Sequence, residues 1–354
     1  MRFGISFFPT VSPTEKSAYQ YYEECLDLTV LAEELGFHHV KTVEHYFHPY
    51  GGYSPDPVTF LAAAAARTNR VRLVTGAAIP AFTHPIKLAG KLAMLDNISG
   101  GRLDAGFGRA FLPDEFEAFG VPIEESRRRF SEGVEACKLL WTQEDAVWDG
   151  EFYRFGPVTM LPRPCQRPHP PVMVAAAASS DSCEAAGRAG HNLQLVPSIS
   201  HRERVQDMLA LYRKAWVDAG HAPGTEHVQL SYTCYLAAAE AEARRGGRMS
   251  HENYTSKLAE AVSAWAHTSS AQYPGYERLA QQVTSSDFEQ ALRDTKILAG
   301  SPEQVRRQVA QIRDWYGDAT LSLQVTSGNL PIEESARTMR LFATEVMAMF
   351  DRGD

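Results

Sequence analysis

Short apolar runs alternate with longer amphipathic helical patterns along nearly the whole chain of 354 residues. This alternation favours βα units and a parallel sheet, because neighbouring parallel strands need a crossover connection. The predicted strands are residues 2–8, 39–43, 71–77, 103–107, 172–176, 192–196, 228–235 and 320–324. The predicted helices are residues 19–35, 57–68, 85–97, 126–141, 180–189, 203–219, 302–315 and 332–350. Right-handed crossovers would close these strands into a (β/α)8 TIM barrel.

We expect one domain over residues 1–354, with two insertions that a minimal barrel does not need. Residues 147–171, before the fifth strand, contain an Asp-Gly turn and then six prolines, which predicts a hairpin and an extended connector. Residues 240–282, after the seventh strand, are too long for an ordinary loop. Their polar, arginine- and glycine-containing stretches indicate a mobile lid, and extra helices on the barrel rim are the alternative.

Composition excludes several classes of protein. The net charge of −8 argues against a nucleic-acid partner, which needs clustered basic residues. No apolar run reaches the roughly 18 residues that a membrane span requires, so we expect no membrane association. The 5 cysteines lack CxxC spacing, which predicts reduced thiols in a cytoplasmic protein rather than disulfides or a zinc site.

Glu44 and His45 directly follow the second predicted strand and precede an aromatic loop over residues 46–53. Side chains at the carboxyl ends of barrel strands face the active site. His45 is therefore a candidate general base, although a structural, hydrogen-bonded histidine fits the same position. Glu44 either fixes the tautomer of His45 or accepts hydrogen bonds from the backbone. No carboxylate stands at a metal-ligand spacing from His45 or His48, so we predict no metal site.

The ends of three further strands carry candidate binding residues. Gly76-Ala77-Ala78 would let a flat ligand approach the backbone, with ordinary tight packing as the alternative. Arg109 and Arg127 are candidate anion ligands, because a guanidinium stays charged and binds phosphate with two hydrogen bonds. Ser179 and Ser180 precede a predicted helix, where they would cradle a phosphate or only cap the helix.

Several stretches taken together carry a family resemblance. They are Val43-Glu44-His45, residues 76–80 with Thr83-His84-Pro85, residues 95–102, Gly106-Phe107-Gly108-Arg109 and Glu125-Ser126-Arg127. On these stretches the chain resembles the bacterial luciferase-like flavin-dependent monooxygenases over nearly its whole length.

The resemblance implies a barrel that binds reduced FMN from a separate flavin reductase. Such an enzyme uses O2, through a flavin peroxide, to oxygenate a small or medium organic substrate by hydroxylation or a Baeyer–Villiger reaction. The resemblance places the catalytic histidine on His45, and the phosphate contacts on Arg109, Arg127 and the pair Ser179-Ser180. It places the flavin ring against Gly76-Ala77-Ala78, over a non-prolyl cis bond at Ala77–Ala78.

The family also implies a homodimer or heterodimer that pairs through early helices. The small-residue face of residues 62–66 either contacts such a partner or packs on the barrel.

The chain departs from luciferase itself at three places, so the resemblance does not imply light emission. A cysteine of luciferase is replaced by Phe107 or Gly108, a second histidine by Tyr46, and a Glu-Ser pair by Ala176-Ala177. Two alternatives keep the fold. One is a deazaflavin-dependent hydride-transfer oxidoreductase, and the other is a non-catalytic flavin-binding partner subunit.

Overall fold

The parallel strands of the computed structural model close into a barrel within the described residues, which are 1–177, 179–284 and 287–350. The barrel strands are β1 (Phe3–Phe7), β2 (His39–Thr42), β3 (Arg72–Thr75), β4 (Leu103–Gly108), β7 (Val172–Ala176), β8 (Asn192–Leu195), β9 (Val228–Leu236) and β11 (Thr320–Gln324). Strand β1 pairs with β2 and β11, and β9 pairs with β8 and β11. The ring has no open edge, and the predicted (β/α)8 barrel is confirmed.

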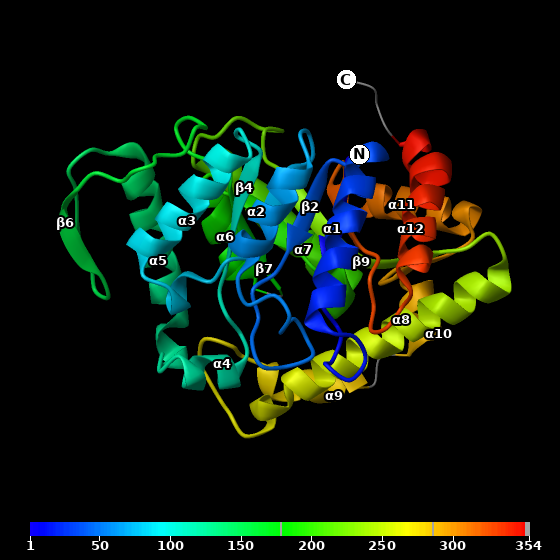
Figure 1. Cartoon of the computed structure of the whole chain (residues 1–354). Helices are drawn as coiled ribbons and strands as arrows, with labels where there is room; N and C mark the ends of the chain where they lie inside the picture. Colours follow the sequence, from blue (N-terminus) through cyan, green and yellow to red (C-terminus); the bar gives the residue numbers. More distant parts are fainter. Residues whose placement is uncertain (178, 285–286, 351–354) are drawn as a thin grey trace.

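The helices surround this ring (Figure 1). They are α1 (Ala18–Glu34), α2 (Pro57–Arg67), α3 (Pro85–Ile98), α4 (Pro113–Ala118), α5 (Ser126–Thr142), α6 (Ser180–Arg188), α7 (Arg202–Asp218), α8 (Glu240–Ala261), α9 (Leu279–Thr284), α10 (Phe288–Arg293), α11 (Pro302–Tyr316) and α12 (Ile332–Leu341). The predicted helices all begin within one residue of the observed ones, and most of their starts carry a capping side chain or a proline. Asp56, for example, accepts a hydrogen bond from the backbone N–H of Val58 at 2.9 Å.

The carboxyl-terminal part differs from the prediction in two ways. The last predicted helix ends as α12 at Leu341, and a π-helical turn over Phe342–Val346 follows it. A short strand, β10 (Leu298–Gly300), pairs with the end of the long strand β9 beyond the barrel ring. Three residues are too few to give a periodic pattern in the sequence.

Polar side chains fill much of the barrel interior. His39 on β2 lies 3.1 Å from the Nε2 atom of Gln229 on β9, and Lys41 on β2 donates a hydrogen bond to Ser231 on β9 at 2.6 Å. Strands β2 and β9 are not neighbours in the sheet, so these bonds cross the inside of the barrel. The floor beneath the carboxyl ends of the strands is therefore hydrogen-bonded rather than purely apolar.

The segment between α3 and β4 fixes where β4 begins. Gly100 and Gly101 take φ angles of 64° and 84°, which only glycine adopts at little cost, and they end α3. Arg102 then donates hydrogen bonds to the backbone oxygens of Ser99 and Val71, both at 2.8 Å. This network holds the turn, so that β4 runs through the barrel and leaves Arg109 just past its carboxyl end.

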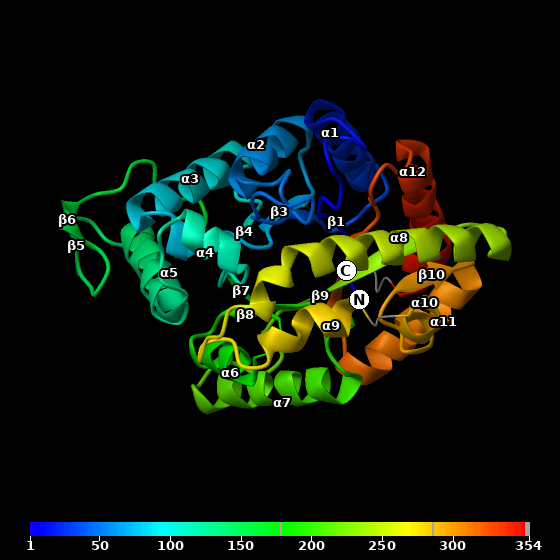
Figure 2. The same cartoon turned by 90° about the horizontal axis from the view of Figure 1, so that it is seen from below.

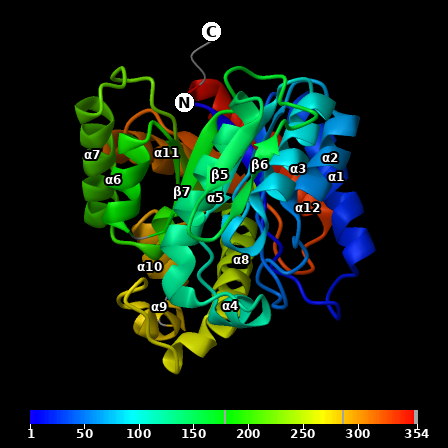
Figure 3. The same ribbon diagram turned by 90° about the vertical axis from the view of Figure 1, so that its left-hand side faces the viewer.

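The first insertion forms the predicted hairpin, from β5 (Ala146–Asp149) and β6 (Arg154–Val158). Figure 3 shows this hairpin outside the barrel beside α5. The second insertion is helical, and Figure 2 shows its helices α8 and α9 lying across the barrel strands. They lie on the side opposite the two chain termini (Figure 1).

The small-residue face of α2 is divided between the barrel and the surface. Ala64 and Ala65 are buried against the barrel, whereas Ala63 and Ala66 are exposed. The described helices include none that is long and apolar enough to cross a membrane.

Candidate functional site

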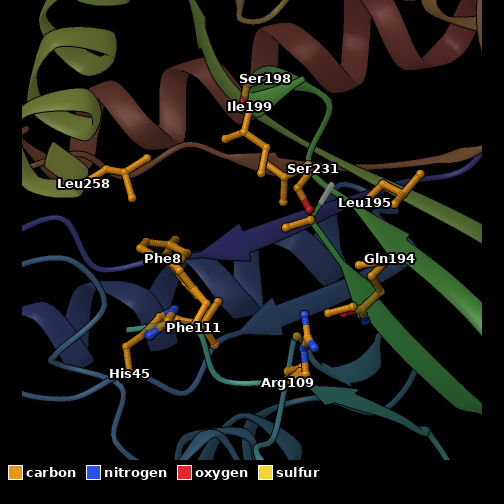
Figure 4. Close-up of a pocket in the computed structure, with 18 of the residues that line it drawn as sticks. Phe8, His45, Arg109, Phe111, Gln194, Leu195, Ser198, Ile199, Ser231 and Leu258 are labelled. Atoms are coloured by element: carbon orange, nitrogen blue, oxygen red, sulfur yellow. The ribbon is translucent and has the colours of Figure 1, made fainter. Parts of the chain in front are cut away.

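A cavity of about 490 Å³ opens at the carboxyl ends of the barrel strands. Its wall combines strand ends and βα loops with the second insertion, which contributes Tyr254, Leu258, Tyr273 and Tyr276. Figure 4 shows His45 beside Phe8 and Phe111 on one side of the cavity, and Arg109 with Gln194 on another. The sequence had placed its candidate residues at this end of the barrel.

His45 is held by a carboxylate from a distant part of the chain. Its Nδ1 atom lies 3.1 Å from Oε1 of Glu115, which is fully buried on α4. The same Glu115 oxygen accepts a hydrogen bond from the backbone N–H of Tyr46 at 2.8 Å. A carboxylate at Nδ1 favours the tautomer that carries its proton there, and so leaves Nε2 as the acceptor.

Glu44 does not make this contact. Its two oxygens accept hydrogen bonds from the backbone N–H of Ile79 at 2.9 Å and from the hydroxyl of Tyr46 at 2.7 Å. The sequence left two roles open for Glu44: fixing the tautomer of His45, or accepting hydrogen bonds from nearby donors. The structure shows the second role, and Glu115 orients His45 instead. Burial raises the pKa of Glu44 to about 7, while the hydrogen bonds from Tyr46 and Ile79 lower it.

Aromatic rings surround the His45 imidazole. The ring centroids of Phe8, Tyr50 and Phe111 lie 5.8, 5.4 and 5.6 Å from its own. The hydroxyl of Tyr50 lies 3.3 Å from that of Tyr254 on α8. This side of the cavity is apolar and suits a flat organic molecule beside the histidine.

The end of β3 forms another part of the wall. Gly76 and Ala77 line the cavity, whereas Ala78 lies behind it and is bonded through its N–H to the backbone oxygen of Gly106 at 2.9 Å. The cis peptide bond is Gly76–Ala77, so the expected position at Ala77–Ala78 is wrong by one residue. Ala78 is already paired with β4, and the chain therefore turns before it.

Arg109 is a cavity residue whose two terminal nitrogens differ in their hydrogen bonding. Its Nη2 atom donates to the backbone oxygen of Gln272 at 3.0 Å, and the guanidinium lies 4.2 Å from the centre of the Tyr273 ring. Its Nη1 atom is buried and has no hydrogen-bond partner among the described residues. A buried guanidinium N–H without a partner is costly, so this atom fits an anionic ligand group.

The start of α6 lies in the same cavity. Ser179 accepts a hydrogen bond from the backbone N–H of Ser182 at 3.3 Å, and both serines line the wall. Ser180 occupies the first turn of α6 and is not part of the lining. The serine pair that faces the cavity is thus Ser179 with Ser182, because the helix turns Ser180 away.

Arg127 lies on α5, outside the cavity wall. Burial lowers the pKa of Arg109, and the charge of Arg127 lowers it further, so the two guanidinium groups are close enough to interact. Arg127 therefore adds positive potential to the site without lining it.

The sequence reasoning missed several polar lining residues, among them Lys41, Arg204 and Ser231. A signal existed for Lys41, since a lysine inside a short apolar strand is unusual. Arg204 lies in the first turn of α7, the helix after β8, and the start of a helix after a strand was also the signal that suggested Ser179.

The second insertion is bonded to the loop that follows β4. The indole N–H of Trp265 donates to the backbone oxygen of Phe111 at 2.9 Å, and the hydroxyl of Tyr273 donates to the backbone oxygen of Ala110. The second insertion forms extra helices on the barrel rim, as the alternative to a mobile lid expected. These helices and the segment after α8 cover the cavity. No group of three or more metal-ligating side chains occurs in the described parts of the chain.

A model of the luciferase-like monooxygenase family matches residues 1–319. The chain belongs to the luciferase-like monooxygenase family. The resemblance inferred from the motifs is thereby confirmed.

Individual members of the family are similar to this chain over most of its length. It is 34% identical over 246 residues, or 69% of the chain and 67% of the relative, to the oxygenase component of a flavin-dependent trigonelline monooxygenase from Acinetobacter baylyi. Among solved structures, monooxygenase RslO1 from Streptomyces bottropensis is 59% identical, with a TM-score of 0.91 over 99% of this chain and 100% of that chain.

A more distant luciferase-like structure shares the fold. The oxygenating constituent of 3,6-diketocamphane monooxygenase from Pseudomonas putida, a Baeyer–Villiger enzyme in complex with FMN, is 21% identical, with a TM-score of 0.82 over 98% of each chain. F420-dependent enzymes also occur among the matches. The homologues support a flavin-dependent monooxygenase.

Proposed function

We propose that this protein is the oxygenase of a two-component system that uses reduced FMN and O2 to insert one oxygen atom into an apolar organic substrate. The observation that carries this proposal is the arrangement of the cavity. The buried Nη1 of Arg109, which no described residue bonds, lies in one part of the wall, and the His45–Glu115 pair lies among aromatic rings in another. A relative described as an oxygenase component supports delivery of the flavin by a separate reductase.

The residues present fit FMN. Arg109, Ser179 and the start of α6 would hold the phosphate, with Arg127 adding positive charge. Gly76 and Ala77 would face the ring, since their small side chains permit close approach. Bound in its reduced form, FMN supplies the electrons that activate dioxygen.

The side chains of the protein would transfer the proton and exclude water. His45 would accept or return a proton at Nε2, while Glu115 holds the other ring nitrogen. The tyrosines and Trp265 of the second insertion would exclude water from the reacting atoms. The second insertion would open as a lid, because substrate must enter the cavity beneath α8 and the segment after it.

The proposal includes residues 1–354 as one domain in a cytoplasmic homodimer or heterodimer. The exposed alanines of α2 would then be available for pairing. A dimer would leave the cavity of each copy complete, because the described residues of a single chain supply its wall.

The test supplies the purified protein with a flavin reductase, NADH, FMN and ¹⁸O2, together with a panel of aromatic ketones and phenols. Mass spectrometry then measures incorporation of one ¹⁸O atom into product. The expected result is incorporation that requires the protein, FMN and reductase together. In a parallel reaction with reduced F420 in place of FMN, hydride transfer to a substrate without oxygen uptake would favour the deazaflavin alternative. Flavin binding without product from any substrate of the panel would favour a non-catalytic subunit.

A further inference from the structure

Lys41 brings a cationic group to the floor of the cavity. It lies on β2, is only 3% exposed, and lines the cavity together with Ser231 and Gly76. Its ammonium donates to the hydroxyl of Ser231 at 2.6 Å, across the barrel on β9. The side chain therefore spans the barrel directly beneath the site.

The stem of Lys41 packs against the wall formed by the end of β3. A Cβ atom placed on Gly76 would lie 2.3 Å from Cδ of Lys41, so the lysine occupies the space that a side chain at position 76 would need. Gly76 is also one of the two residues that would face the ring of a bound flavin. Lys41 is thus adjacent to the ring part of the cavity, whereas Arg109 and Ser179 are the candidates for the phosphate.

The charge of Lys41 is not balanced inside the protein. Among the described residues its bonded partner is a neutral hydroxyl, and no carboxylate pairs with it. The neighbouring interior layer contains His39, Gln229 and Ser322, and burial lowers the pKa of His39 well below its usual range, so this layer is neutral as well. Burial lowers the pKa of Lys41 to about 7. A buried amine of this kind is stabilised as a cation when an anion binds beside it.

The two redox states of FMN differ in the charge of the ring. The oxidised ring is neutral, and the reduced ring is an anion near neutral pH, while the phosphate is the same in both. A contact to the phosphate therefore strengthens the binding of both states alike. A contact to the ring anion strengthens the binding of the reduced state alone.

We propose that Lys41 binds the anionic ring of the reduced flavin and makes the cavity selective for reduced over oxidised FMN. This inference rests on the proposed function and assigns a role to a residue that the sequence reasoning did not select. A two-component oxygenase benefits from such selectivity, since it must take up the reduced flavin and release the oxidised one.

The test measures dissociation constants of FMN in both redox states, the reduced state under anaerobic conditions. The variants are Lys41→Met, which keeps the length and removes the charge, and Lys41→Gln, which keeps hydrogen bonding. Lys214→Met removes an exposed lysine charge on α7 and serves as the matched control. Thermal melting confirms that each variant is folded.

We expect the wild type to bind reduced FMN about tenfold more tightly than oxidised FMN, as one charge-assisted contact allows. Both Lys41 variants should lose this preference and bind oxidised FMN within about twofold of the wild type, with Lys214→Met unchanged. The midpoint potential of bound FMN should then fall by about 30 mV, the equivalent of a tenfold change for two electrons. Arg109→Met, in contrast, should weaken both states equally.

Retention of the preference for reduced FMN in both Lys41 variants, or an equal loss of affinity for both states, overturns the inference and leaves the proposed function standing. A change confined to binding of an organic substrate would assign Lys41 to the substrate and also overturn it. A wild-type protein that binds neither state of FMN removes the proposed function together with this inference.

Discussion

The imidazole of His45 and the carboxylate of Glu115 lie 3.1 Å apart, although 70 positions separate them in the sequence. Glu115 is fully buried, and its second oxygen, Oε2, has no hydrogen-bond partner in the described parts of the chain. Its charge is therefore directed mainly at the histidine and at the N–H of Tyr46. This pairing gives His45 a defined orientation toward the cavity.

Replacing His45 with alanine should separate flavin use from oxygenation. We expect the rate of product formation to fall by about 10²- to 10⁴-fold, the usual contribution of a positioned acid or base, and the product formed per NADH to fall with it. Binding of reduced FMN should stay within about threefold of the wild type, because the phosphate contacts remain. Glu115→Gln should show a smaller loss and a changed pH profile, and hydrogen peroxide should account for the missing oxygen. An unchanged yield of product in His45→Ala would remove the catalytic role of His45.

The two candidate arginines should differ in their effect on flavin affinity. Arg109→Met should weaken FMN binding by about 10- to 100-fold, the value of a buried charge-assisted hydrogen bond. Arg127→Met should cost less, because Arg127 lies outside the cavity wall. Arg128→Met is the control, since this neighbouring arginine is exposed and paired with Glu151. Isothermal titration measures the affinity for FMN, and thermal melting measures the stability of each variant. Equal losses of affinity and stability in Arg109→Met would show that Arg109 has a structural role.

Arg102 should contribute to stability and not to binding. Its guanidinium donates to four backbone oxygens, of Ser99, Val71, Ala65 and Thr68. Arg102→Met leaves these oxygens without their donor and should lower the free energy of unfolding by about 2–4 kcal/mol in urea denaturation. The exposed Arg70→Met should change it by less than about 0.5 kcal/mol. A loss of FMN affinity in folded Arg102→Met would contradict this assignment.

Stability should depend on pH through Glu44. Its pKa is about 7 in the folded protein and 4.5 in an unperturbed side chain, so the neutral form is favoured by folding. The contribution of Glu44 to the free energy of unfolding is fully present below pH 4.5 and is lost as pH rises through 7. The total loss is about 3 kcal/mol. Glu44→Gln lacks this loss, and its stability relative to the wild type should therefore rise between pH 5 and pH 8, as urea melts measure. The exposed Glu117→Gln should show no such trend, and a constant difference for Glu44→Gln would contradict the assignment.

Sequence periodicity was sufficient for the barrel, because apolar residues recur in every barrel strand and most helices begin at a capping residue or a proline. It was not sufficient for contacts between distant segments. Glu115 reaches His45 from a helix of six residues, too short to be recognised by periodicity. Lys41 and Ser231 meet only because β2 and β9 face each other across the closed barrel.

Local geometry accounts for the smaller errors. Ser179 and Ser180 are equivalent in the sequence, yet the cap turns Ser179 toward the cavity and Ser180 away. Ala78 pairs with Phe107 of β4, and the cis bond lies at Gly76–Ala77, one residue earlier than expected. The tyrosines that cover the site belong to the second insertion. The sequence indicated the length of this insertion but not its contacts with the cavity.

The cavity should bind reduced FMN for reaction with oxygen. The most direct test is an anaerobic titration of the wild-type protein with reduced FMN and, in parallel, with reduced F420, followed by fluorescence. Saturable binding of reduced FMN, weakened in Arg109→Met and not in Arg128→Met, is the predicted result. Binding of reduced F420 with no binding of reduced FMN would contradict it.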